Sequence, residues 1–168
     1  RLTRNTFTEL SHSYIHNEYG PDGATPRLTS RDGEYFETGL LQRFYFSNGR
    51  RNVFFRYELD NAAARGNNFD RVGHLIEAGF HTPLIKNVLF DFSLSFGTGH
   101  YPHYSAEVAP AEPKARLNND WALLTALTFP LSDKWSLRTF YRYVNANNKN
   151  DIYQYDRHLS GMEIRLRY

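Results

Sequence analysis

The amino-acid sequence predicts an all-β protein in which about eight antiparallel strands follow one another up and down in a single domain of 168 residues. Apolar and polar residues alternate along most of the chain, which is the side-chain period of a β-strand. No run approaches the 18 consecutive apolar residues that a transmembrane helix needs. Connections between the alternating segments are long and short in turn, as in a series of hairpins.

The last fourteen residues, 155–168, show the alternation most clearly. One register is mostly apolar and ends on an aromatic; it holds His158, Ser160, Met162, Ile164, Leu166 and Tyr168. The other register is mostly charged and holds Arg157, Leu159, Gly161, Glu163, Arg165 and Arg167. An edge strand of a soluble sandwich would explain this segment alone. The charged register would also suit a wet or ion-paired lumen, with the apolar register facing lipid.

Eight segments of this kind are expected as strands: residues 5–16, 35–46, 52–60, 71–82, 88–98, 119–129, 135–144 and 155–168. Their lengths suit tilted strands that cross a bilayer, which need about 9–11 residues, and exceed the typical soluble strand of about 5–6. In the first segment the facing is ambiguous, because Leu10 and Tyr14 share one register and Phe7 and Ile15 the other.

The connections predict which end of each strand faces which compartment. Short turns are expected around Asn48-Gly49, a strong hairpin signal, and at 83–87 and 130–134. Long polar loops are expected at 17–34, 61–70, 99–118 and 145–154. Outer-membrane barrels place short turns in the periplasm and long loops outside the cell. Both termini are therefore expected in the periplasm.

The two registers predict two surfaces. A charged surface facing the lumen would hold Arg43, Arg56, Arg71, Arg138, Arg142, Arg157, Arg165, Arg167, Glu37, Glu58, Asp60, Glu77, Asp91, Asp120 and Glu163. The apolar surface would carry aromatics near both ends, as in the girdles of membrane barrels: Phe36, Phe44, Phe46, Tyr57, Phe80, Phe96, Trp121, Phe129, Trp135, Tyr143 and Tyr168. Strand length and these two girdles favour a transmembrane barrel over a soluble one.

Composition agrees with that choice. Aromatic residues make up 16% of the chain, yet the mean hydropathy of −0.63 is too polar for a helical membrane protein. A barrel places apolar residues only at alternate positions, so its mean hydropathy can be low. The chain has no cysteine, which excludes a disulfide framework. A net charge of +2 without a basic cluster argues against a nucleic-acid partner.

Two interpretations of the charged register remain open. The charges, whose signs nearly cancel, would either line a pore for a hydrated solute or pair across a filled interior. Large residues share this register: Leu41, Phe54, Leu75, Leu89, Leu124, Phe140 and Leu159. Their bulk favours a filled interior for eight strands taken alone, since eight strands enclose little open space.

Seven histidines raise the question of catalysis or metal binding. His100 and His103 fall in the longest loop, and His12 and His16 on or beside the first strand. No sequence motif marks a nucleophile or a phosphate loop, so no catalytic residue, metal site or cofactor is expected. A small lipid-A-modifying barrel hydrolase is kept as an alternative.

The segment from Asn118 to the end carries a family resemblance. Its residues are Asn119-Asp120-Trp121 opening a strand, Phe129-Pro130-Leu131-Ser132 at a turn, Tyr141-Arg142-Tyr143, Asn147-Asn148, Tyr153-Gln154-Tyr155-Asp156-Arg157-His158, and the terminal Tyr168. This pattern resembles the C-terminal barrel of outer-membrane proteins that carry a periplasmic tetratricopeptide-repeat region. They include exopolysaccharide-export porins and surface-lipoprotein assembly modifiers.

The resemblance implies a porin-like transport or translocation role in the Gram-negative outer membrane, with export of a polymer or polypeptide. A closed structural barrel without transport is the alternative. Expected partners are outer-membrane lipid and lipopolysaccharide, the barrel-insertion machinery acting on the closing strand, and a protein partner in the periplasm or outside the cell. Eight strands are about half of what such barrels use, and no repeats are seen. The chain is thus expected to be the distal part of a larger barrel or a small complete one.

Overall fold

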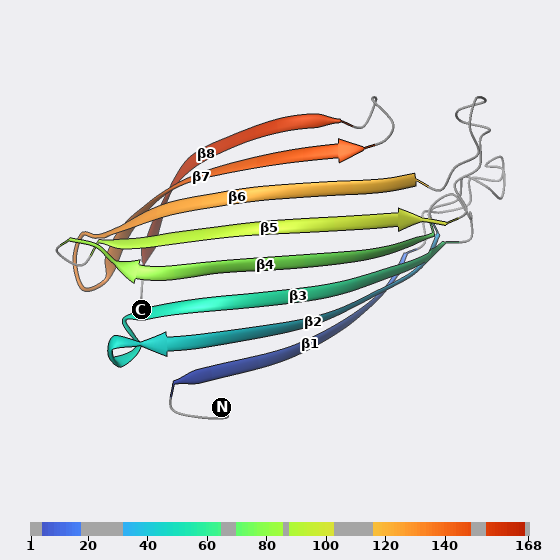
Figure 1. Cartoon of the computed structure of the whole chain (residues 1–168). Helices are drawn as coiled ribbons and strands as arrows, with labels where there is room; N and C mark the ends of the chain where they lie inside the picture. Colours follow the sequence, from blue (N-terminus) through green and yellow to red (C-terminus); the bar gives the residue numbers. More distant parts are fainter. Residues whose placement is uncertain are drawn as a thin grey trace.

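Eight long strands make up nearly all of the computed structural model, which describes residues 5–17, 32–64, 70–85, 88–102, 116–148 and 154–166. In chain order they are β1 (Thr6–Asn17), β2 (Gly33–Phe46), β3 (Arg51–Ala64), β4 (Arg71–Pro83), β5 (Leu89–Tyr101), β6 (Arg116–Pro130), β7 (Trp135–Asn148) and β8 (Tyr155–Leu166). A one-turn 3₁₀ helix, η1 (Ser47–Gly49), joins β2 to β3. Figure 1 shows the strands side by side in one curved sheet.

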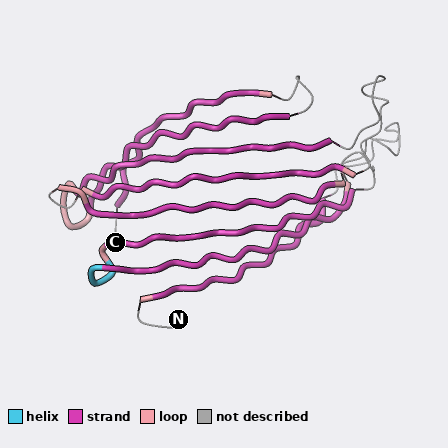
Figure 2. The backbone as a smooth tube through the Cα atoms, in the orientation of Figure 1, coloured by secondary structure: helices cyan, strands magenta, loops and turns pink. Residues whose placement is uncertain are grey.

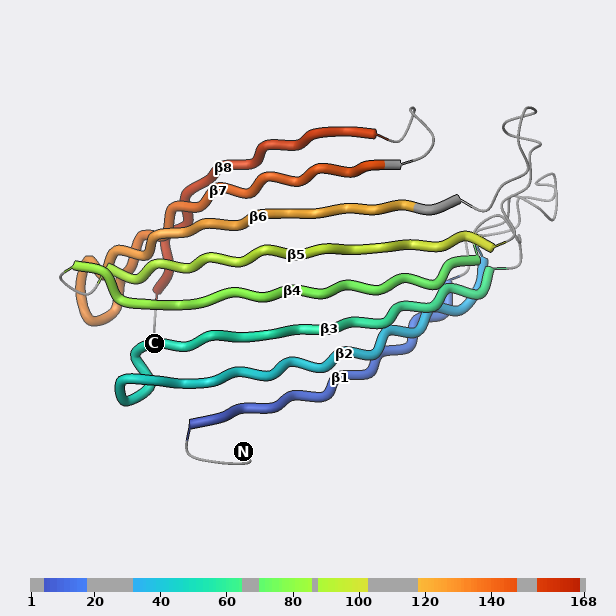
Figure 3. The backbone as a smooth tube through the Cα atoms, in the orientation of Figure 1, coloured from blue at the N-terminus to red at the C-terminus, as the bar shows by residue number. Residues whose placement is uncertain are grey.

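Each strand pairs antiparallel with the next in the sequence, so the order across the sheet is β1 to β8 (Figure 3). The predicted all-β, up-and-down arrangement of eight strands is therefore confirmed. Closure into a barrel is not seen within the described residues: β1 and β8 are the two margins of an open sheet. Each margin is 12 residues long.

The three described connections lie at one end of the sheet, called the short-turn end (Figure 2). At the first, Ser47, Asn48 and Gly49 all have positive φ angles, which Asn and Gly adopt most readily. At the second, the Leu84 amide donates to the Val88 carbonyl over 2.8 Å. At the third, the Leu131 amide donates to the Trp135 carbonyl over 2.9 Å. β1 begins and β8 ends at this end; the opposite end is called the long-loop end.

Several strands extend further than the alternation predicts. β3 continues through residues 61–64, and β7 through 145–148, although both stretches were expected as loop. Their small and polar residues carry no hydrophobic signal, but their backbones continue the ladder: Ala62 pairs with Tyr35 and with Arg71. Ladder hydrogen bonds depend on the neighbouring backbone and not on hydropathy, so strand ends escape a pattern-based prediction.

The two faces of the sheet differ completely. The face shared by Arg43, Asp60, Asp91 and Arg138 is called the charged face, and the face shared by Phe44, Phe80, Trp121 and Met162 the apolar face. Every buried residue of the described strands lies on the charged face: Gly39, Asn52, Asp60, Gly73, Ser93, Gly99, Ala122, Ala126, Ser136 and Ala146. A curved sheet crowds the side chains on its concave side, so the charged face is the concave one.

Pairing with β2 settles the facing of β1. Phe7 pairs with Arg43 and Ile15 with Tyr35, so both lie on the charged face. Leu10 pairs with Leu40 and Tyr14 with Phe36, which places both on the apolar face. Leu10 and Met162, on the two margins, are each 76% exposed.

Candidate functional site

The concave, charged face is the candidate functional surface. Register places fourteen of the residues proposed for the lumen on this one face, from all strands between β2 and β8: Arg43, Arg56, Arg71, Arg138, Arg142, Arg157, Arg165, Glu37, Glu58, Asp60, Glu77, Asp91, Asp120 and Glu163. Arg167 lies outside the described residues. Alternation over six hairpins thus gathers charges that are far apart in sequence.

The long-loop half of the charged face contains a hollow of about 330 Å³. Arg71 Nη2 binds Asp60 Oδ2 over 3.1 Å, and Arg56 forms an ion pair with Glu58 on its own strand. Asp60 Oδ1 and Arg71 Nε are buried without a hydrogen-bond partner among the described residues. Buried polar atoms normally find a partner in protein or water, so this hollow suits water or a polar solute.

A second hollow of about 370 Å³ occupies the short-turn half of the charged face. Glu163 accepts from Arg165 over 2.7 Å and lies 3.5 Å from Arg138, so one carboxylate serves two guanidinium groups on β7 and β8. His81 Nδ1 and Asp91 Oδ1 are 2.5 Å apart. The guanidinium of Arg43 lies over the ring of Phe54, 5.4 Å from its centroid, a cation–π arrangement.

Arg142 differs from the expectation of paired charges. Its cross-strand partners are Leu124 on β6 and Leu159 on β8. It forms no ion pair with another described residue. It is exposed and lines the long-loop hollow. Among the residues that the structure describes, the arginines that form ion pairs are Arg56, Arg71, Arg138 and Arg165.

Side chains of neighbouring strands lie over glycines on the charged face, in the space that a Cβ atom would occupy. A Cβ at Gly161 would lie 2.7 Å from Cζ of Phe140, its partner across β7 and β8, and one at Gly73 would lie 2.2 Å from Asp60 Oδ2. A side chain at either position would therefore force Phe140 or Asp60 out of its present place. These large residues therefore lie across the wall, over the next strand, instead of projecting straight toward the middle.

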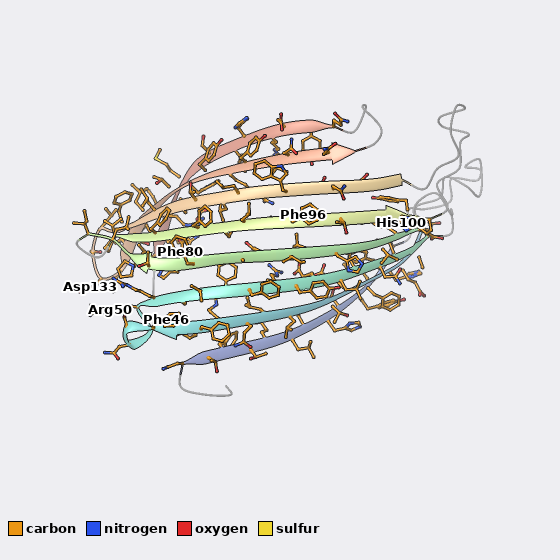
Figure 4. The ribbon with its side chains drawn as sticks, viewed as in Figure 1. Phe46, Arg50, Phe80, Phe96, His100 and Asp133 are labelled. Carbon is orange, nitrogen blue, oxygen red and sulfur yellow. The ribbon has the colours of Figure 1, made fainter. Side chains whose placement is uncertain are left out.

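The apolar face carries the predicted aromatics at both ends. Figure 4 shows Phe46 and Phe80 near the short-turn end, and Phe96 with His100 toward the long-loop end. Register adds Phe44, Phe129 and Trp135 to the first group, and Phe36, Tyr57, Trp121 and Tyr143 to the second. Tyr168 lies outside the described residues. Neighbouring rings pack together: the Phe80 and Phe92 centroids are 5.5 Å apart, and those of Trp121 and Tyr143 4.9 Å.

The borders of this apolar band run obliquely across the strands. A row of directly paired residues leads from Gln42 on β2 to Tyr143 on β7; it passes through Phe55, Ala78, Leu94 and Leu123. On β7 the long-loop border is Tyr143, within this row. On β2 the border is Phe36, which lies beyond the row by the distance between positions 36 and 42.

This offset gives the tilt of the strands relative to the band. Six residues span about 20 Å along a strand, and five strand spacings about 24 Å, which corresponds to a tilt of about 40°. The other border moves the same way. A second row of directly paired residues leads from Phe44 on β2 to Tyr141 on β7. Toward the short-turn end, the apolar face of β7 extends beyond this row as far as Trp135. On β2 it extends only to Phe46.

Sequence reasoning placed His158 in the apolar register but did not identify the hydrogen-bonded polar pairs on the apolar face. Tyr57 Oη and His74 Nδ1 are 2.8 Å apart, and the same distance separates Tyr141 Oη and His158 Nδ1. Tyr143 and Asn145 both donate to Asp156 Oδ1, over 2.9 and 2.7 Å. The sequence does contain this information, because each of these histidines is separated by an even number of positions from the apolar residues of its own strand and therefore shares their face.

Searches of protein-family models, of curated proteins and of solved structures found no match to this chain. Within the residues that the structure describes, no helix has the length and hydropathy to cross a membrane. No group of three or more His, Asp or Glu side chains in the same residues is arranged to hold a metal ion.

Proposed function

We propose that this chain forms part of the wall of a Gram-negative outer-membrane β-barrel, with its charged face toward a water-filled lumen through which a polymer or polypeptide is translocated. The observation that carries the membrane assignment is the oblique apolar band. Strands of outer-membrane barrels are tilted by about 35–45° and cross an apolar band about 25 Å tall. The long-loop border gives a tilt of about 40°, within that range; the short-turn border slopes the same way, and its offset of four residues over the same five strand spacings gives about 30°.

The same border residues and tilt also give the height of the band. Eight residues separate Trp135 from Tyr143 on β7, and ten separate Phe36 from Phe46 on β2. At about 3.3 Å per residue and a tilt of about 40°, these spans rise about 20–25 Å along the membrane normal. An apolar groove of about 390 Å³ between β5 and β7, lined by Phe90, Leu127 and Tyr141, would suit an acyl chain.

The charged face supports the translocation part of the proposal. Its two hollows are lined by both signs of charge, and its ion pairs are short-range, so a hydrated solute would meet no single-sign barrier. Large side chains seated over glycines leave space along the wall. A wide lumen is compatible with such packing, whereas side chains directed to the centre would fill it.

In a bilayer the two open margins need partners, because unpaired backbone groups in hydrocarbon are costly and exposed edges promote association. β1 and β8 run in opposite directions and have the same length. They are therefore suited to pair with each other or with further strands of the same alternating type. Under this proposal the short-turn end faces the periplasm and the long-loop end the cell exterior.

Tryptophan fluorescence tests the membrane assignment directly. The chain has two tryptophans, both on the apolar face, with Trp121 in the long-loop girdle and Trp135 in the short-turn girdle. In vesicles, lipids brominated near the headgroup should quench each tryptophan more strongly than lipids brominated deep in the chain. The variants Trp121→Phe and Trp135→Phe report the two girdles separately. Absence of quenching in both would contradict a lipid-facing apolar surface.

Conductance tests the translocation part. In planar bilayers the assembled barrel should conduct ions, and Arg43→Ala with Arg142→Ala should shift its ion selectivity toward cations. A lipid-inserted protein that never conducts would favour the closed structural barrel instead.

A further inference from the structure

Histidines are distributed unevenly over the two faces of the sheet. Five lie on the apolar face, and each sits in the long-loop half of its strand: His12, His16, His74, His100 and His158. Within the described strands, no lysine or arginine accompanies them on that half of the apolar face. Figure 4 shows His100 at the long-loop end, beyond Phe96. The one described histidine on the charged face, His81, lies near the short-turn end.

Two of these histidines are held in the same way on different hairpins. Tyr57 on β3 contacts His74 on β4, and Tyr141 on β7 contacts His158 on β8; both pairs have Oη–Nδ1 distances of 2.8 Å. The ring centroids are 6.1 Å apart in each pair. A hydroxyl that donates to Nδ1 leaves the ring proton on Nε2. Both rings are exposed, so Nε2 of each is accessible from outside, and in the tautomer in which Nδ1 accepts from the tyrosine hydroxyl it carries a proton to donate.

The position of the pairs relative to the apolar band indicates their surroundings in a membrane. His158 lies in the row of Tyr143, at the long-loop border of the band, and its ring is 4.9 Å from the Tyr143 ring. His74 lies one row beyond Tyr57, at the border on β4. Rings of tyrosine and tryptophan at such a border lie at headgroup depth. Phosphate groups are the principal hydrogen-bond acceptors of lipids at that depth.

We propose that the histidine–tyrosine belt, formed by Tyr57, His74, Tyr141 and His158, binds the phosphate groups of lipid headgroups in the outer leaflet. The proposal rests on the membrane assignment above and names a specific lipid contact within it. An N–H donor directed at an ionised phosphate makes a stronger hydrogen bond than one between neutral groups. Histidine suits this place better than lysine or arginine, because the neutral imidazole can cross an apolar phase during insertion without the cost of a fixed charge.

No acidic side chain among the described residues is hydrogen-bonded to His74 or His158. Asp156 is two residues from His158 on β8, but its Oδ1 is engaged by Tyr143 and Asn145 on β7. The belt therefore presents the imidazole edges of two hairpins at one membrane depth. Each pair offers a donor to one phosphate group, so a phosphorylated glycolipid is a ligand of suitable chemistry for either hairpin.

Native mass spectrometry in detergent with added lipid A tests the proposal. Diphosphorylated lipid A should be retained by the unmodified protein, and dephosphorylated lipid A should be retained much less. In the double variant His74→Leu/His158→Leu, apparent affinity for diphosphorylated lipid A should fall about tenfold or more, since hydrogen bonds to a charged partner are lost. Tyr57→Phe/Tyr141→Phe, which removes only the hydroxyls that orient the rings, should reduce affinity less.

The control is Thr8→Leu/Thr82→Leu, two polar-to-leucine changes on the apolar face in the short-turn halves of β1 and β4, where neither residue pairs with a member of the belt. Equal retention of both lipids by the unmodified protein would overturn the proposal. An effect of the control as large as that of the histidine variant would overturn it as well. Tryptophan quenching in vesicles, measured on the same proteins, separates the two levels. A protein that inserts but ignores lipid phosphate refutes the belt alone, and a protein that fails to insert refutes the membrane assignment.

Discussion

The ring of Phe54 on β3 lies directly over Gly79 on β4. A Cβ atom at position 79 would be 2.6 Å from Phe54 Cε1 and 2.4 Å from the backbone oxygen of Phe92. The first contact could be relieved by a side-chain rotation, but the second involves backbone and cannot. Position 79 therefore requires glycine because of the Phe92 backbone oxygen, and the Phe54 ring occupies the space that a side chain would need.

Gly79→Ala should consequently destabilise the folded protein by about 1–3 kcal/mol, the usual cost of overpacking. Urea-induced unfolding in lipid micelles measures the change. The matched control is Gly97→Ala, also on the charged face, where the nearest atom to a new Cβ is Leu75 Cδ1 at 3.7 Å. Similar losses in both variants would mean that the close contacts at position 79, with Phe92 and Phe54, are not the cause.

A charge on the apolar face should hinder membrane insertion. Phe92 lies mid-strand on β5, packed on Phe80, so Phe92→Arg should cost about 2–4 kcal/mol at the bilayer midplane. Ser95→Arg on the charged face is the control, because Ser95 borders the long-loop hollow. Ser93, nearer to Phe92, is only 6% exposed and has less room. The inserted fraction in vesicles should separate the two variants; equal insertion would show that the facing is wrong.

The Arg71–Asp60 pair should contribute measurably to stability. The Asp60 side chain is 12% exposed and that of Arg71 39%, so solvent screens the pair in part. We expect Arg71→Ala to cost about 1–2 kcal/mol, between the values for exposed and for fully buried pairs. A double-mutant cycle with Asp60→Asn isolates the coupling between the two residues. Additive losses would show that the 3.1 Å contact contributes little.

Topology can be read with single cysteines, because the chain has none of its own. Cysteines at Asn67, between β3 and β4, and at Asn148, the last residue of β7, should react with an impermeant reagent on intact cells. A cysteine at Asn48, in the turn between β2 and β3, should react only after the outer membrane is opened. Labelling of position 48 alone on intact cells would invert the orientation.

Paired cysteines can test whether the eight strands close on themselves. Leu10 on β1 and Ile164 on β8 are margin residues of the apolar face, 76% and 69% exposed. The seating of large side chains along the wall favours more than eight strands. We therefore expect no disulfide within one molecule between Leu10→Cys and a cysteine at Met162, Ile164 or Leu166.

Leu10→Cys with Leu40→Cys, which pair directly in β1 and β2, provides the positive control for this experiment. An efficient intramolecular disulfide between β1 and β8 would instead support a small, closed barrel.

Alternation was sufficient to predict the eight strands and the face on which Arg43, Asp60 and Trp121 lie, because apolar residues in the same strand identify the parity. It failed on β1, where both registers contain apolar residues and only pairing with β2 decides. It also failed at the strand ends, such as Asn145 to Asn148, where small polar residues join a ladder without a hydrophobic signal. The seat of Phe54 over Gly79 depends on inter-strand register, which a single sequence does not reveal. Whether the sheet closes into a barrel depends on how β1 and β8 pair, and the alternation of apolar and polar residues does not reveal that pairing.

The opposite character of the two faces also limits how the strands can change in length during evolution. One residue added within β5 would turn every later side chain of that strand to the opposite face, so that Phe92, Leu94 and Phe96 would exchange places with Asp91, Ser93 and Ser95. Two added residues would preserve the facing and shift only the register, and a local bulge could absorb one. Insertions and deletions within the strands of related sequences should therefore involve even numbers of residues or form bulges. In the connections between strands, insertions and deletions of any length should occur.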